Sequence, residues 1–347
     1  MGNVVPLDFQ KQAALLDGLG VLDYEGLRRI ADVAVPWAID GLMTERSVNI
    51  LAGDSGIGKT PLATMAAIHK AAGLPFLGHA TRQGPVLYCA GEGDVTQFSQ
   101  MIQVLSETAG LDRPPPDFRV WGPFWSLNPG DSAGFDPIVK RARILRPTLI
   151  VVDTLRIFIP QIEEKASEAA RWIKRMRELS AEVGCIWLLI HHRRKPSDER
   201  YVDLAADPDQ WFHDIAGSSA LVTQTDLRLG MDLCRRIPKK ADLILAGRVR
   251  GSGLIPVHYV VREYGEDNEP RGYQILAGRN RLDAGEQVAF DALPEQFTRT
   301  QLAERIGGQS DSNVARYIND FKAAGLITQP VRRGPYLKVR GVPGDER

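Results

Sequence analysis

Cysteines are few in this chain of 347 residues, and long apolar runs are lacking. The cysteines Cys89, Cys185 and Cys234 are odd in number and far apart, which argues against a disulfide framework and offers no zinc-binding spacing. No window approaches the roughly 20 apolar residues that a membrane span needs, and the first ten residues contain no apolar run of the signal-peptide type. We therefore expect a cytoplasmic protein with reduced thiols and no membrane contact.

An excess of charge of either sign is also lacking. Lysine and arginine together number 43, and so do aspartate and glutamate, so the formal net charge is zero. A chain-wide positive field that would attract nucleic acid is therefore excluded, and any such contact must come from local patches. The length allows one large domain with a sizeable core and a second, small domain.

The strongest functional signal is a glycine-rich segment between two apolar runs. Residues 53–60 read GDSGIGKT, after the strand-like run 48–52 and before the helix-like run 62–68. This pattern is a P-loop, in which backbone N–H groups and a helix N-terminus cradle phosphates. Lys59 would reach the β- and γ-phosphates of ATP, and the Thr60 hydroxyl would ligate Mg²⁺. The predicted nucleotide-binding residues are Gly53, Asp54, Ser55, Gly56, Ile57, Gly58, Lys59, Thr60 and Pro61.

Two carboxylates follow later apolar runs. Glu92 lies between glycines after the run 86–90, and Asp153 closes the run 149–152. Open α/β sheets hold their ligands at the carboxyl ends of the strands, where both side chains would lie. We predict that Glu92 orients and polarises the attacking water and that Asp153 holds Mg²⁺ opposite Thr60. For Glu92, a solvated turn residue is the alternative.

Basic residues follow a fourth apolar run, 185–190, and begin a segment with few apolar side chains that extends to residue 215. This segment either lines a nucleic-acid channel, with Arg193, Arg194 and Lys195 as phosphate contacts, or is a solvated surface loop. Further on, Arg248 and Arg250 precede a glycine-rich turn. They are either surface charges or fingers that reach a nucleotide bound by the adjacent subunit.

The two ends of the chain differ in character from this core. Residues 1–35 predict a helical arm, which would contact a neighbouring subunit or pack on its own domain. Helix patterns at 284–293, 297–307 and 310–324, followed by short strands at 326–329 and 336–339, predict a winged helix-turn-helix in residues 281–347. Its candidate DNA contacts are Arg316, Arg332 and Arg333, and protein contact or oligomer assembly is the alternative use.

Taken in order, these motifs resemble those of the RecA-like ATPases and, more narrowly, of the plasmid RepA-type hexameric replicative helicases. The resemblance covers about residues 30–265 and rests on WAIDG at 37–41, VLY at 86–88 with Glu92, LIVVDT at 149–154, the histidine pair at 191–192 with Lys195, and Gly217 with the serine after it. It implies an α/β fold with a mostly parallel sheet in residues 36–280, ATP and Mg²⁺ as cofactors, and a homo-oligomeric ring, a hexamer. In such a family Glu92 would be the catalytic base, His191 the γ-phosphate sensor, and Arg248 or Arg250 the finger from a neighbouring protomer.

Three functions compete. We predict an ATP-hydrolysing motor that passes single-stranded DNA through its core, contacts duplex DNA through the winged helix, and serves replication or mobilisation of a plasmid, phage or integrated element. The alternative is an ATP-dependent winged-helix DNA-binding regulator or loader that does not unwind DNA. A kinase fits less well, because the sequence offers no lid and no acceptor site.

Overall fold

The computed structural model describes residues 23–31, 36–125, 132–194, 202–217, 219–235, 241–250, 253–265, 270–276, 282, 284–307, 311–323, 326–329 and 334–339. The chain forms two compact units, Met1–Pro36 and Trp37–Arg347. In the first unit, the described residues form helix α2 (Tyr24–Ala31), within the segment for which the sequence predicts a helical arm. None of the helices described has the length and apolar character that a bilayer crossing requires.

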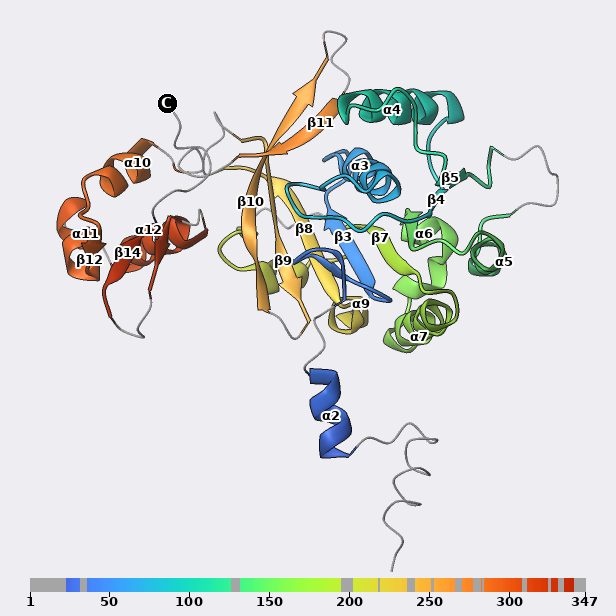
Figure 1. The fold of residues 1–347 in the computed structure, drawn as a ribbon, viewed down its shortest axis with the longest axis horizontal. Coiled ribbons are helices and arrows are strands. Elements are labelled where there is room, and N and C mark those ends of the chain that lie inside the picture. Colours follow the sequence, from blue (N-terminus) through green and yellow to red (C-terminus); the bar gives the residue numbers. More distant parts are fainter. Residues whose placement is uncertain are drawn as a thin grey trace, which may run out of the picture. The chain divides into compact units, whose positions relative to one another are not determined.

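A nine-stranded sheet forms the centre of the second unit (Figure 1). Its order is β11-β10-β9-β8-β3-β7-β6-β4-β5, in which the strands from β8 to β5 run parallel and β9, β10 and β11 are antiparallel to their neighbours. The strands are β3 (Val48–Gly53), β4 (Val86–Ala90), β5 (Phe118–Trp121), β6 (Leu149–Asp153), β7 (Ile186–His192), β8 (Leu227–Leu233), β9 (Leu243–Val249), β10 (Gly253–Tyr264) and β11 (Pro270–Ile275). The predicted α/β fold with a mainly parallel sheet is confirmed.

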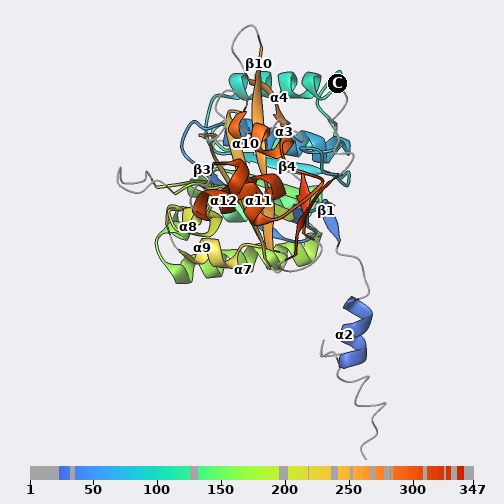
Figure 2. The same ribbon diagram turned by 90° about the vertical axis from the view of Figure 1, so that its left-hand side faces the viewer.

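Helices cover both faces of this sheet, as Figures 1 and 2 show. On one face lie α3 (Lys59–Ala72) and α4 (Val95–Thr108), and on the other lie α5 (Phe135–Leu145), α7 (Ala166–Val183), α8 (Pro208–Phe212) and α9 (Ser219–Gln224). Shorter elements are β1 (Trp37–Ile39), β2 (Met43–Thr44), α6 (Leu155–Phe158) and a 3₁₀ helix (Pro160–Glu163).

Each central strand therefore has two buried faces. In β3, Leu51 packs towards α3 and α4, whereas Val48 and Ile50 pack towards the helices of the opposite face. Side chains alternate between the two faces of a strand, so a strand covered on both sides becomes a continuous apolar run. This explains why the runs in the sequence identify the strands of the sheet.

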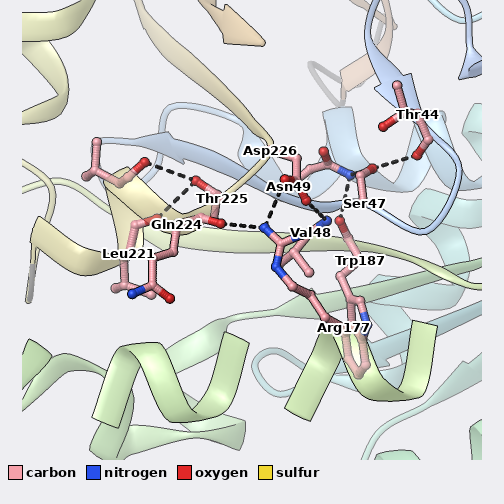
Figure 3. A network of polar contacts seen from close by, with 11 residues as sticks. Thr44, Ser47, Val48, Asn49, Arg177, Trp187, Leu221, Gln224, Thr225 and Asp226 are labelled. Carbon is pink, nitrogen blue, oxygen red and sulfur yellow. Dashed lines mark hydrogen bonds and ion pairs between the residues drawn. The ribbon is translucent and has the colours of Figure 1, made fainter. Parts of the chain in front are cut away.

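A polar network fixes the start of the P-loop strand, at the edge of the sheet away from the P-loop (Figure 3). The Asp226 carboxylate accepts hydrogen bonds from the backbone N–H of Val48 and from the Arg177 guanidinium, both at 2.9 Å. The buried Asn49 amide donates to the carbonyl of Trp187 in β7 at 3.0 Å. These contacts set the register of β3 against its two neighbours and so determine where the P-loop begins.

The C-terminal residues build a core of their own around apolar side chains such as Leu302, Val314 and Phe321. They form α10 (Ala284–Asp291), β12 (Gln296–Phe297), α11 (Arg299–Arg305), α12 (Asp311–Ala323), β13 (Ile327–Thr328) and β14 (Tyr336–Lys338), with the strands in the order β12-β14-β13. The three predicted helices are present. The sequence prediction missed β12, because the Thr298 N-cap starts α11 just after Phe297.

Candidate nucleotide-binding site

The P-loop connects the end of β3 to the start of α3. Gly56 and Gly58 have positive φ angles of 73° and 106°, a conformation that glycine adopts at little cost. The Lys59 ammonium group is buried and donates hydrogen bonds to the carbonyls of Gly53 at 2.9 Å and Asp54 at 2.6 Å. Burial lowers the pKa of Lys59, against the opposing effect of nearby carboxylates.

A cavity of about 340 Å³ opens above this loop, at the carboxyl edge of the parallel strands. Its lining from the P-loop consists of Ser55, Gly56, Gly58, Lys59, Thr60 and Pro61. Glu92, Asp153 and Thr154 from the ends of β4 and β6 line it as well. Of the other predicted nucleotide-binding residues, Gly53 and Asp54 contact the Lys59 side chain, and Ile57 is buried in the core.

Asp153 has the surroundings of a ligand for a hard cation. Its buried carboxylate accepts a hydrogen bond from the Tyr88 hydroxyl at 2.6 Å, and the Thr60 hydroxyl also bonds to it. Burial raises the pKa of Asp153, while these two hydrogen bonds lower it.

The residues present fit Mg²⁺. The described residues contain no group of three or more histidine, cysteine or acidic side chains that would form an all-protein metal cage. One carboxylate beside one hydroxyl, facing a phosphate loop, suits Mg²⁺, which keeps several waters and shares its remaining coordination with phosphate oxygens. Asp153 and Thr60 would hold the ion.

Glu92 is held from two sides. The hydroxyl of Thr154 donates to the Glu92 carboxylate at 3.1 Å, and the Trp125 indole N–H donates to the carbonyl of Gly93 at 3.0 Å. Trp125 itself packs on Phe98 of α4, with ring centroids 5.3 Å apart. The sequence prediction identified Glu92 but missed both supports, because nothing local in the sequence links Trp125 to the turn after β4.

The histidine pair at the end of β7 is arranged differently from the expectation. His192 lines the cavity, beside Gly53 in the parallel register. His191, the expected γ-phosphate sensor, is fully buried: its Nε2 donates to the carbonyl of Ala216 at 2.8 Å, and its Nδ1 lies 3.6 Å from the Glu163 carboxylate. Successive side chains of a strand point to opposite faces, so only one histidine of the pair can face the phosphates. The residue of the pair that lines the cavity is His192.

Arg248 and Arg250 lie at the end of the sheet where the parallel strands begin, on the side opposite to the P-loop. Arg248 pairs with Arg228 across β9 and β8, next to the start of β3, and its guanidinium forms an ion pair with Asp209 at 2.6 Å. The backbone N–H of Arg250 donates to the carbonyl of Asp226. Within one chain, neither arginine is brought to the P-loop.

The structure also corrects the expectation for Arg193. Its side chain is 1% exposed, forms ion pairs with Asp214 at 3.0 Å and Asp232 at 3.8 Å, and lies over the Trp211 ring at 4.6 Å. A buried guanidinium with these partners is not exposed to a DNA phosphate. The exposed Arg194 donates to the carbonyl of Gly217, and Lys195 lies outside the described residues.

The segment after Arg193 is also more ordered than a plain loop. Within its described part, residues 202–217, helix α8 forms and Leu204, Trp211, Phe212 and Ile215 are buried. These side chains join the core beneath the sheet. The sequence prediction underestimated them because they are spread among acidic residues.

In the C-terminal core, Arg316 is committed to acidic partners. Its guanidinium lies 2.7 Å from Glu286 and 3.7 Å from Asp320, and it covers the Tyr317 ring at 4.6 Å. A phosphate contact by Arg316 would compete with these ion pairs. The other two arginines that the sequence predicts as DNA contacts, Arg332 and Arg333, lie outside the described residues.

Three further lining residues come from the β10–β11 hairpin, far away in the sequence: Arg262, Tyr264 and Tyr273. The Tyr273 hydroxyl donates to the carbonyl of Gly58 in the P-loop at 3.0 Å, and burial raises its pKa. Nothing local in the sequence of the hairpin indicates that it packs on the P-loop.

A doubly covered sheet, a P-loop, and the carboxylates of Asp153 and Glu92 around one cavity define a P-loop ATPase. Residues 23–198, about half of the chain, match a protein family described as an AAA domain, and the chain belongs to this family. The family implies nucleotide binding, usually with Mg²⁺. No curated protein matches the chain.

Proposed function

We propose that this P-loop ATPase is a RecA-like motor of the RepA-type helicase kind, which assembles into a hexameric ring and moves along single-stranded DNA. The observation that carries the proposal is the convergence of Lys59, Asp153 and Glu92 on one cavity at the carboxyl edge of the sheet. These are the three charges that hydrolysis of a nucleoside triphosphate requires.

Each residue has a separate part in the chemistry. Backbone N–H groups of the P-loop and Lys59 bind the β- and γ-phosphates, and Glu92 orients a water for attack in line with the leaving oxygen. Mg²⁺, when bound by Thr60 and Asp153, supplies charge neutralisation on the phosphates. His192 lies where it can contact the γ-phosphate. Positioning and charge account for catalysis of this kind, without a covalent intermediate.

The proposal of a ring is supported by the position of the two predicted fingers. Arg248 and Arg250 lie at the opposite edge of the sheet from their own P-loop, so they can serve only a nucleotide bound by another chain. A head-to-tail assembly would bring this end of the sheet of one protomer to the cavity of the next, and such heterologous contacts form a ring when the rotation between protomers closes. An arginine supplied in trans can raise the turnover rate by roughly a thousandfold or more.

DNA contact is the second part of the proposal. Three helices and a three-stranded antiparallel sheet with a separate core are the elements of a winged helix-turn-helix, which we assign to duplex DNA. Single-stranded DNA would pass through the ring and contact the segment that begins at Arg194.

The test is the steady-state ATPase rate with and without single-stranded DNA, together with the mass of the assembly bound to a non-hydrolysable ATP analogue. We expect strong, salt-dependent stimulation and a closed multi-subunit mass, and the Lys59→Ala variant should lose hydrolysis. Turnover retained by Lys59→Ala would contradict the assignment of the site. A wild-type protein that hydrolyses ATP but ignores single strands would contradict the motor.

A second candidate function is an ATP-dependent regulator or loader that binds duplex DNA and does not unwind it. The ion pairs of Arg193 favour it, because they remove a basic side chain expected to contact single-stranded DNA. In this case the nucleotide state would control oligomerisation and binding to one duplex site, and single-stranded DNA would leave the ATPase rate unchanged.

A further inference from the structure

One face of the β10–β11 hairpin is directed at the nucleotide cavity. Arg262 pairs with Tyr273 across the hairpin, and Tyr264 follows two residues later on β10, so the three side chains share a face. All three line the cavity. Val260 and Tyr273, on the same face, belong to the core beneath α3 and α4.

The register of the sheet brings this face to the P-loop. Val260 pairs with Leu243 and Leu243 with Leu233, which lies two residues beyond Met231, the partner of Gly53. Arg262 and Tyr264 therefore extend past the carboxyl edge of the sheet, on the side where the P-loop lies. The hydrogen bond from the Tyr273 hydroxyl to Gly58 attaches the hairpin to the loop.

Tyr273 also fits closely against the P-loop. A Cβ atom on Gly58 would lie 2.6 Å from the Tyr273 hydroxyl, so the contact needs the glycine at this position. Because Tyr273 lies opposite Arg262, the contact also fixes the position of the Arg262 backbone relative to the loop. Tyr273 is thus a positioning residue.

Arg262 differs in its partners from Arg193, Arg248 and Arg316. Arg193, Arg248 and Arg316 each form an ion pair, whereas Arg262 forms none with any residue in the described part of the chain. Its Nε is buried and has no hydrogen-bond partner there. The guanidinium lies 5.6 Å from the Tyr264 ring centroid.

A cation in such a place needs an anion. A partly buried guanidinium that is neither paired nor fully hydrated is costly, and a phosphate oxygen satisfies its fork of N–H donors well. The P-loop beside Arg262 is the predicted binding site for the phosphate chain of a nucleotide. Lys59, the other cationic side chain that reaches the loop, is bonded to two loop carbonyls.

We propose that Arg262 contacts the phosphate chain of the nucleotide bound by its own chain, with Tyr273 holding the hairpin on the P-loop. The proposal rests on the ATPase assigned above and adds a charge to that site. One chain then supplies two cations to its phosphates, Lys59 and Arg262, before any finger arrives from a neighbour.

The first test is binding of a fluorescent, non-hydrolysable ATP analogue with Mg²⁺ to the full chain. Arg262→Ala should weaken affinity by roughly tenfold or more, as expected for loss of a charge-assisted hydrogen bond. Arg262→Gln, which keeps most of the aliphatic stem, should give the same loss and replaces the alanine variant should that one fail to fold. Arg119→Ala removes an exposed arginine from the edge strand β5, is the matched arginine control, and should bind as the wild type does.

Two results would overturn the proposal. The first is an affinity within about twofold of wild type for a folded Arg262→Gln variant, since a lost phosphate contact costs more than that. The second comes from mixing Arg262→Ala with Lys59→Ala. If the contact lies within one chain, the ATPase activity of the mixture should not exceed the sum of the activities of the two separate variants. Activity above that sum would show that Arg262 acts on a neighbour's nucleotide.

These outcomes separate the proposal from the proposed function. A wild-type protein that ignores single-stranded DNA, with Arg262 variants that bind the analogue weakly, would reject the motor and keep Arg262 as a phosphate contact. A DNA-stimulated wild-type ATPase with Arg262 variants that bind normally would reject the Arg262 contact alone.

Discussion

Replacing Thr154 by valine tests whether Glu92 orients the attacking water. The Thr154 hydroxyl donates to the Glu92 carboxylate at 3.1 Å, and the side chain is 3% exposed. Valine has the same shape and removes only the hydroxyl. Thr154 is the N-cap residue of α6 but its side chain makes no capping bond, so the substitution leaves the helix start intact.

The size of the effect follows from the geometry of this contact. A hydrogen bond to a charged group contributes about 1.5–3 kcal/mol when it is desolvated, and the exposure of Glu92 places this bond near the lower limit. A loss of about 1.4 kcal/mol in the transition state corresponds to a tenfold slower chemical step. Nucleotide affinity should change by less than about twofold, because Glu92 acts on the water and not on the nucleotide.

The assay is the single-turnover rate of ATP hydrolysis, with affinity measured separately by a fluorescent analogue. Thr154→Ser should hydrolyse ATP at the wild-type rate, since serine keeps the hydroxyl. The double variant of Thr154→Val with Glu92→Gln should be no slower than Glu92→Gln alone. A slower rate that persists in the serine variant would show that Thr154 acts through packing. A Glu92→Gln variant that hydrolyses ATP normally would place the base elsewhere and refute the reasoning.

Three further outcomes follow from the structure. Tyr273→Phe should weaken nucleotide binding severalfold and leave the melting temperature nearly unchanged, because it removes only the hydroxyl bond to Gly58; unchanged binding would contradict a positioning role. Arg193→Met should destabilise the protein by about 3–5 kcal/mol in denaturant unfolding, because it leaves two acidic partners near a buried site without their cation, and a wild-type unfolding midpoint would contradict this. Burial lowers the pKa of His191 in the folded protein. The unfolded state therefore binds the proton first, and stability falls as the pH drops below the ordinary pKa of histidine. Between pH 7.5 and 5.5, the melting temperature of His191→Gln should fall less than that of the wild type.

The P-loop and both carboxylates could be predicted from the sequence because their signals are local. Eight consecutive residues determine the P-loop, and Glu92 and Asp153 each close an apolar run. Parallel strands bring their carboxyl ends to one edge, so knowing the strands was enough to bring the two carboxylates together. The order of the strands was not needed for that step.

The remaining site residues depend on contacts between distant parts of the chain. A shift of one residue along β7 decides whether His191 or His192 faces the cavity, and two adjacent histidines give no local sign of which one it is. Arg193 forms an ion pair with Asp232, which comes almost forty residues later. Arg262 reaches the P-loop only because β9 runs antiparallel to β8 and β10 antiparallel to β9, which brings the end of β10 to the carboxyl end of the parallel strands.

The two edges of the sheet separate binding from assembly. Lys59 and Arg262 line the cavity at the carboxyl end of the parallel strands in the same chain, so the affinity proposed for them would be independent of protein concentration. Arg248 and Arg250 lie at the opposite edge, and any contribution they make to turnover requires a second chain. Under the proposed ring, such a site would bind its nucleotide as a monomer and gain its full rate only in the oligomer. Assembly would then be the step that controls hydrolysis, and nucleotide binding by each chain would precede it.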